Sequence, residues 1–174
     1  NNLAPTTSSA CHLAIGDAIA MTLQKLKGFT PQDFSKYHPS GNLGKKLTLT
    51  LNNLIDKNRK PFVEKSSSFL KIIDEISSNM YGATAVIQDN TIVGVITDGD
   101  IRRVIEKKQN IENISASDFM NKNPKIMTEN TLAIEALKHM KENRISQVLI
   151  IDSSNVYLGI VHILDIIKEG VNNE

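Results

Sequence analysis

A strand–turn–helix motif that occurs twice constrains the fold of this chain more than any other feature. The first copy, residues 94–103, reads GVITDGDIRR: apolar residues lead into a short Thr/Asp/Gly turn and then into helical spacing. The second copy, residues 159–168, reads GIVHILDIIK. Gly159 follows Gly94 by 65 residues (159 − 94), and Asp165 follows Asp100 by the same distance (165 − 100). An internal repeat of this size predicts two consecutive structural units of one design.

Each unit is predicted to run strand, helix, strand, strand, helix, with the units at residues 48–113 and 114–174. Residues 49–55 are predicted to be an amphipathic lead-in to the first unit, and residues 117–120 a helical turn that opens the second. The predicted fold class is α/β (α+β).

The turn after each buried strand offers chemistry for a ligand. Backbone N–H groups point outward where a strand runs into a helix. In the first copy Thr97 adds a hydroxyl and Asp100 a carboxylate, which together suit a phosphate and a ribose hydroxyl. The alternative is that Thr97 or Asp98 simply caps the helix. The second copy keeps Asp165 but has His162 at the hydroxyl position.

Composition excludes several classes of function. The formal net charge of the 174 residues is +1 and aromatic residues make up 5%, so neither a nucleic-acid surface nor an anionic-membrane surface is indicated. The single cysteine, Cys11, excludes an internal disulfide and fits a reducing compartment. The four histidines are scattered, with none at metal-ligand spacing from another histidine or from Cys11, so no metal site is predicted. With no apolar run of membrane-spanning length, we expect a cytoplasmic protein.

Residues 1–47 have a different character from the repeats. A helix is predicted at about 9–27, ended by Gly28, and a second at 31–37. Apolar residues cover more than one face of the first helix, so it should be buried between neighbours that this chain does not supply. The sequence also starts without an initiator methionine. We therefore expect residues 1–47 to be the tail of a larger domain, and the exposed apolar helix to favour a homo-oligomer, a dimer or tetramer.

A histidine follows the second helix. His38 precedes Pro39, Ser40 and a stretch with two glycines and two lysines, residues 41–46. Such a histidine fits either an acid/base residue beside an anion-binding loop or a surface residue in a linker turn.

In their order along the chain, these segments resemble the end of the sugar isomerase domain of D-arabinose 5-phosphate isomerases. The resemblance is carried by LAPTTS (3–8), AIGDAIA (14–20), GFT (28–30) and HPSGNLGKKL (38–47), followed by two units similar to cystathionine-β-synthase-type (CBS) domains. It implies a tandem CBS pair with pseudo-twofold symmetry, preceded by the helical tail of a sugar isomerase domain. It also implies that His38 belongs to the family's active site.

The resemblance further implies ligands and a reaction. The family interconverts ribulose 5-phosphate and arabinose 5-phosphate for Kdo synthesis, and a CBS pair has two clefts between its units. By resemblance Thr97 and Asp100 contact a nucleotide in one cleft, His162 and Asp165 in the other, with Thr84 as a further candidate. The expected regulatory ligand is either CMP-Kdo, which pathway logic favours as the activated end product, or an adenine nucleotide, the default of the wider family; no cofactor is required. Because the family's phosphate loop, glutamate and lysine are not in this sequence, we expect these residues alone to be inactive as an isomerase. A structural module with vestigial clefts is the alternative to a regulatory one.

Overall fold

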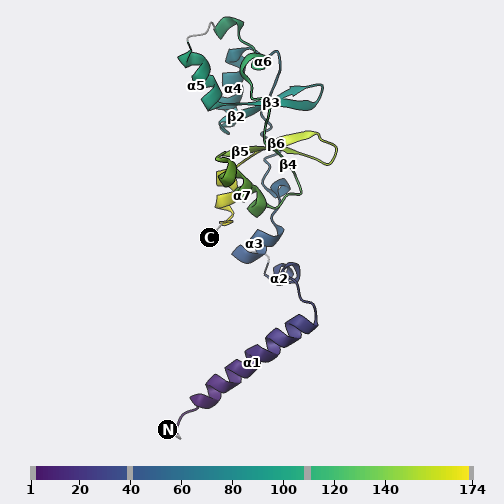
Figure 1. Ribbon diagram of the computed structural model, residues 1–174, viewed down its shortest axis with the longest axis vertical. Coiled ribbons are helices and arrows are strands. Elements are labelled where there is room, and N and C mark those ends of the chain that lie inside the picture. Colours follow the sequence, from purple (N-terminus) through teal and green to yellow (C-terminus); the bar gives the residue numbers. More distant parts are fainter. Residues whose placement is uncertain (1–2, 39–40, 108–110, 173–174) are drawn as a thin grey trace. The chain divides into compact units, whose positions relative to one another are not determined.

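A computed structural model describes residues 3–38, 41–107 and 111–172 (Figure 1). The chain divides into two compact units, Asn1–Leu47 and Thr48–Glu174. The smaller unit holds α1 (Thr7–Leu26), α2 (Pro31–Tyr37) and most of α3 (Asn42–Thr48).

Helix α1 buries none of its residues, although six large apolar side chains lie along it. These side chains are Leu13, Ile15, Ile19, Met21, Leu23 and Leu26. Thr6 stands at the N-cap position, but its side chain makes no capping hydrogen bond. At the other end Gly28 adopts a φ of +61°, the left-handed conformation with which helices often end.

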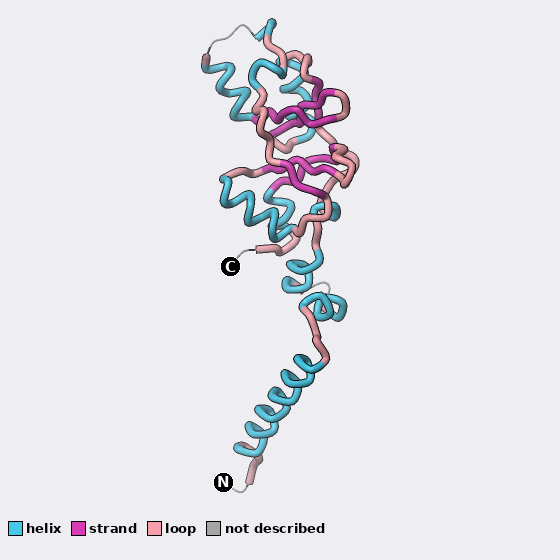
Figure 2. The backbone as a smooth tube through the Cα atoms, turned by 45° about the vertical axis from the view of Figure 1, so that its right-hand side comes forward, coloured by secondary structure: helices cyan, strands magenta, loops and turns pink. Residues whose placement is uncertain are grey.

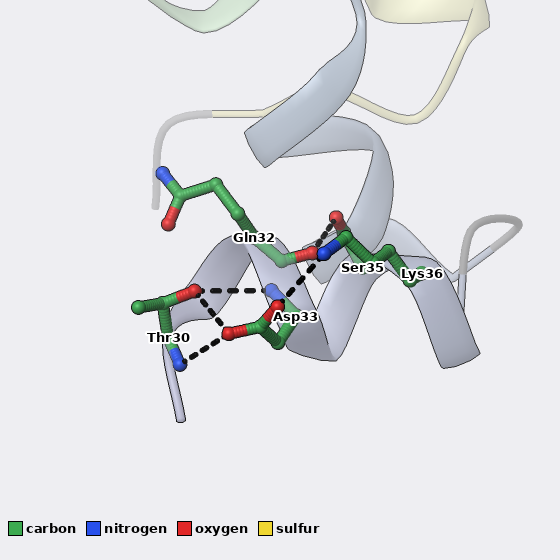
Figure 3. Close-up of polar contacts among 5 residues, drawn as sticks. All are labelled: Thr30, Gln32, Asp33, Ser35 and Lys36. Atoms are coloured by element: carbon green, nitrogen blue, oxygen red, sulfur yellow. Dashed lines mark hydrogen bonds and ion pairs between the residues drawn. The ribbon is translucent and has the colours of Figure 1, made fainter. Parts of the chain in front are cut away.

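Helix α2 begins with a reciprocal capping box (Figure 3). The Asp33 N–H donates to the Thr30 hydroxyl oxygen (3.2 Å), and the Thr30 N–H and hydroxyl donate to the Asp33 carboxylate (3.1 and 2.7 Å). Lys36 also donates to Asp33 (2.9 Å). These bonds, that from Lys36 foremost, hold the pKa of Asp33 well below its usual range.

The larger unit contains the two predicted repeats, each with a three-stranded sheet. In the first repeat the parallel pair β1–β2 is followed by the antiparallel hairpin β2–β3. Its elements are η1 (Leu51–Asn53), β1 (Phe62–Glu64), α4 (Phe69–Asn79), β2 (Ala83–Gln88), β3 (Thr91–Thr97), α5 (Asp98–Glu106) and η2 (Ile111–Asn113).

The second repeat copies this order and register, with β4–β5 parallel and β5–β6 antiparallel. A register shift falls at the same place in both hairpins, at Val86/Ile87 and at Ile150/Ile151. Its elements are α6 (Ala116–Phe119), β4 (Ile126–Thr128), α7 (Ala133–Asn143), β5 (Gln147–Ile151), β6 (Tyr157–His162) and α8 (Ile163–Lys168). The predicted order of strand, helix, strand, strand and helix is thus confirmed in both repeats.

The sheets lie face to face in the middle of the larger unit, and α4, α5 and α7 lie on their outer sides (Figures 1 and 2). One apolar cluster joins the inner faces of the two sheets: Tyr81, Ala83, Ala85, Leu149, Tyr157 and Ile160. Separate cores lie beneath the helices of each repeat. The central cluster makes the pair one packed body.

The repeats exchange their first helical turns. Leu51, in the turn before the first sheet, is fully buried in the core of the second repeat, and its N–H donates to the Thr131 carbonyl (2.9 Å). Ala116, the counterpart at the start of the second repeat, is buried in the core of the first, and its N–H donates to the Ser67 carbonyl (2.9 Å). Residues 49–55 are therefore not a lead-in to the first unit in space, because their apolar side chains pack on the second.

Candidate functional site

A cleft of about 150 Å³ lies between the two sheets beside the first strand–turn–helix motif. We call it the first cleft. Four apolar side chains (Ala83, Val95, Ile145, Leu149) and five polar ones (Thr97, Asn121, Asn123, Lys125, Gln147) line it, together with Pro124. The arrangement combines apolar walls with amides, a hydroxyl and one cation, as a small polar organic ligand requires.

Thr97 and Asp100 form the N-terminal cap of α5. The Thr97 N–H and hydroxyl donate to the Asp100 carboxylate (2.9 and 2.6 Å), and the Asp100 N–H points back to the Thr97 hydroxyl (3.4 Å). The capping interpretation of the motif is therefore correct as geometry. Thr97 also lies in the wall of the cleft. Its hydroxyl oxygen has two lone pairs, so it can accept a further hydrogen bond from a ligand.

Asp100 lies next to Thr97 but does not line the first cleft. Its second carboxylate oxygen pairs with Arg103, and both residues border a hollow of about 180 Å³ between α5 and α6. The predicted pair is thus brought together, with Thr97 facing the cleft and Asp100 holding Thr97 in place.

The second motif repeats the same cap with different chemistry. The His162 N–H donates to Asp165 (3.1 Å), and His162 Nδ1 accepts the Leu164 N–H (3.1 Å). The imidazole therefore takes the place of the threonine hydroxyl as the capping acceptor of α8.

Thr84, the further candidate, is fully buried, and its hydroxyl reaches only the Ala85 carbonyl, at 3.4 Å. The structure does not support it as a ligand contact, because successive residues of a strand face opposite sides and it is Ala83 that faces the cleft.

Gln147, which was not predicted as a site residue, lines the first cleft and donates to the Tyr81 carbonyl across the two repeats (2.8 Å). The repeat could have indicated it, because Gln147 pairs with His162 in the second hairpin as Ala83 pairs with Thr97 in the first. Gln147 is therefore the neighbour of a predicted site residue.

His38 lies in the smaller unit, at the end of α2. Its side chain is exposed, and its ring lies 4.8 Å from that of Phe34. Of the residues after it that fitted an anion-binding loop or a linker turn, those from Asn42 onward form α3, whereas Pro39 and Ser40 lie outside the described residues.

Two expectations concern absent features. Within the described residues, no group of three or more His, Cys, Asp or Glu side chains is placed to hold a metal ion. None of the helices in the described ranges combines the length and apolar character needed to cross a membrane.

Comparison with known families identifies the repeats. Residues 55–107 and 116–172 each match the model of the CBS domain. The chain belongs to the CBS domain family. The first and second CBS units are accordingly the two repeats described above, and the first cleft lies between them.

The chain is homologous to the C-terminal, CBS-pair region of arabinose 5-phosphate isomerases. It is 40% identical over 168 residues to arabinose 5-phosphate isomerase KdsD of Francisella tularensis, an alignment that covers 96% of this chain and 51% of that protein. It is 37% identical over 166 residues to KpsF of Escherichia coli, covering 95% and 50%. The chain therefore spans about half the length of the curated relatives it matches.

Solved structures of CBS pairs share the fold. A CBS domain protein from Pyrobaculum aerophilum complexed with AMP has a TM-score of 0.62 at 16% identity, covering 67% of this chain and 89% of that one. The CBS domain of a bacterial CNNM/CorC family Mg²⁺ transporter in complex with ATP has a TM-score of 0.61 at 16% identity, covering 73% and 89%.

Proposed function

We propose that residues 48–174 are the regulatory nucleotide-binding module of an arabinose 5-phosphate isomerase, and that an adenine nucleotide binds in the first cleft. The observation that carries this proposal is the position of Thr97, whose hydroxyl lies at the N-terminus of α5 in the wall of a cleft between the two sheets. The homology to isomerases and the AMP and ATP named for two structural neighbours support it.

The lining suggests how a nucleotide would lie. Ile145, Leu149 and Val95 offer apolar contact to a base, and the amides of Asn123 and Gln147 offer hydrogen bonds. The N-terminus of α5 and the ammonium of Lys125 favour a phosphate. The cleft volume of about 150 Å³ is smaller than that of most small-molecule pockets. To admit a whole nucleotide, the exposed side chains of Asn121, Asn123 and Lys125 must move apart; otherwise the phosphate remains outside the cleft.

Calorimetric titration with AMP, ATP, CMP and CMP-Kdo tests the proposal. We expect saturable binding of AMP or ATP and at least a tenfold loss of affinity in Thr97→Val, which keeps the shape of the side chain but removes its hydroxyl. Saturable binding of CMP-Kdo alone would instead make the activated end product the ligand.

Thr50→Val is the matched control, since Thr50 closes a similar capping box with Asn53 and does not line the first cleft. If Thr50→Val reduces affinity as much as Thr97→Val does, lost capping rather than lost ligand contact explains the effect. Absence of binding up to millimolar nucleotide would reject the proposal.

A purely structural module is the second candidate function. The observation that favours it is the self-contained cap, because both carboxylate oxygens of Asp100 already have partners, Thr97 and Arg103. Under this alternative all four nucleotides fail to bind, and disrupting the pair changes only the oligomeric state, which analytical ultracentrifugation measures.

The isomerase activity itself forms part of the proposal and belongs to the whole protein. Aldose–ketose isomerisation needs a base at the C1–C2 protons and a held phosphate, and the exposed imidazole of His38 supplies neither geometry by itself. We expect these 174 residues to leave ribulose 5-phosphate unchanged in a coupled assay. Turnover above that of buffer would contradict this.

A further inference from the structure

The two clefts expected of a CBS pair differ in the segment that crosses each of them. Residues 56–61 and 121–125 begin with the same turn. The Asn58 N–H donates to Asp56 Oδ1 and the Asn123 N–H to Asn121 Oδ1, both at 2.9 Å. After the turn one segment continues with Arg59 and Lys60, whereas the other continues with Pro124 and Lys125.

At the first cleft the segment leaves space. Asn121, Asn123 and Lys125 line the cavity, and the residue that faces them from the start of β5 is the aliphatic Ile145. Met120 and Asn121 pack over Gly94, and the Val95 and Asn121 backbones exchange hydrogen bonds (3.0 and 2.9 Å), so the segment is anchored at its first residues.

At the counterpart position the segment is held along its length by aromatic residues. The Arg59 guanidinium carbon lies 4.5 Å from the centre of the Tyr81 ring. Lys60 Nζ lies 5.4 Å from the centre of the Tyr157 ring, and the Tyr157 hydroxyl donates to the Pro61 carbonyl (2.8 Å).

Both tyrosines stand where the other repeat has an aliphatic residue. The strand registers make Tyr81 the counterpart of Ile145, and Tyr157 the counterpart of Ile92. Both are buried. Tyr81 therefore stands where the first cleft has the aliphatic Ile145, and each tyrosine ring carries a cation.

We infer that Arg59, stacked on Tyr81, closes the second cleft and restricts this CBS pair to one nucleotide per chain. The inference rests on the proposed function for the place of that nucleotide, the first cleft. A guanidinium is planar and stacks on an aromatic face as a nucleobase does, so Arg59 occupies the kind of surface that a base would need.

The charges nearby favour the cation over an anionic ligand. Burial raises the pKa of Tyr81, and the charge of Arg59 opposes that rise. The carboxylates of Asp165 and Asp56 raise the same pKa further, so both act electrostatically on the Tyr81 hydroxyl. A nucleotide phosphate here would displace Arg59 and meet two negative charges. The first cleft is lined by Lys125, and the Asp100 carboxylate lies behind Thr97 there as that of Asp165 lies behind His162.

Stoichiometry tests the inference. Calorimetric titration of the full 174-residue chain with AMP and ATP is expected to give one site per chain. Arg59→Ala is expected to raise this to two. Arg59→Met, which keeps an aliphatic stem on Tyr81 but removes the planar cation, is a second variant should the alanine variant fold poorly by circular dichroism. Arg102→Ala, an exposed arginine on α5, is the matched control and should keep one site.

The outcomes separate this inference from the proposed function. Two sites in the unmodified chain, one of them lost in Thr97→Val, would overturn the closure and leave the proposed function standing. A stoichiometry that stays at one in both Arg59 variants would also overturn the closure. No site in the unmodified chain but one in Arg59→Ala would uphold the closure and reject the first cleft. No site in either protein would overturn both.

Discussion

The two CBS units have nearly the same backbone but different side chains where they face each other. Both hairpins carry the same register shift, and both outgoing helices start with a cap that closes on an aspartate. Yet threonine caps one helix and histidine the other, and Ile92 in one hairpin corresponds to Tyr157 in the other. The comparison shows that the hydrogen bonds of the cap preserve the turn in both units, while the side chains beside the turn differ.

The largest effect that we predict comes from a substitution that disrupts the exchange of helical turns. Leu51→Ala should lower the free energy of unfolding by about 2–5 kcal/mol, because it leaves a cavity in the core of the second unit. Hydrogen exchange should show lost protection first in α7 and α8. Leu70→Ala, at a side chain that is 69% exposed, is the control. Lost protection confined to α4 and α5 would contradict the exchange.

A second prediction concerns the crossing at Gly94. A Cβ there would lie 2.8 Å from the Met120 sulfur and 3.0 Å from the Asn121 carbonyl oxygen. Gly94→Ala should therefore destabilise the chain by about 1–3 kcal/mol and weaken nucleotide binding, since it displaces the segment that lines the first cleft. Thermal melting and titration measure both effects. Gly99→Ala meets nothing closer than 3.6 Å and should cost less; equal losses would disprove the argument.

The aromatic contacts of the second cleft give a third prediction. Tyr157→Phe should cost about 1 kcal/mol, because it removes the hydrogen bond to the Pro61 carbonyl. Burial raises the pKa of Tyr157 well above its usual range, so the unfolded chain loses this proton first and stability should fall as the pH rises past about 10. Urea unfolding should show a shallower alkaline decline in Tyr157→Phe than in Tyr37→Phe, an exposed control. Identical declines would contradict it.

The smallest effect concerns the cap of α6. The Ser115 hydroxyl and N–H donate to Asp118 (2.7 and 2.8 Å) and lower the pKa of that carboxyl, the hydroxyl being the larger cause. Because the folded pKa is depressed, the stabilisation is present above the ordinary value of 3.8 and is lost as the pH falls through the folded value. Asp118→Asn should therefore differ from the unmodified chain at pH 7 and converge with it in acid. Ser115→Ala removes only the hydroxyl bond and should show part of the same pH-dependent loss of stability. A loss of stability in Asp118→Asn that does not change with pH would show that the ionised carboxylate is not its source.

Much of this arrangement was predictable from the sequence. The period between Gly94 and Gly159, the alternation along the strands and the turn residues are local signals, and they predicted the two sheets and most helices. The capping role of Thr97 was also predictable, since a short polar residue before a helix has that role most often.

The rest depends on contacts distant in the sequence. Nothing local shows that Leu51 lies in the same core as Leu137, 86 residues away (137 − 51). Nor does it show that Thr84 is fully buried, because either face of a short strand can be covered by another element. Arg59 likewise reads as a polar loop residue until the fold brings Tyr81 beneath it. Aligning equivalent positions of the two repeats would have shown that Tyr81 stands where the other repeat has Ile145. It would not have shown that Arg59 stacks on that tyrosine.

The exchanged turns also decide where a mechanical disturbance enters the pair. Residues 49–55 join the smaller unit to the first CBS unit along the chain, but their apolar side chains are embedded in the second. A force applied through residues 49–55 would therefore load the core of the second unit, which their side chains help to form.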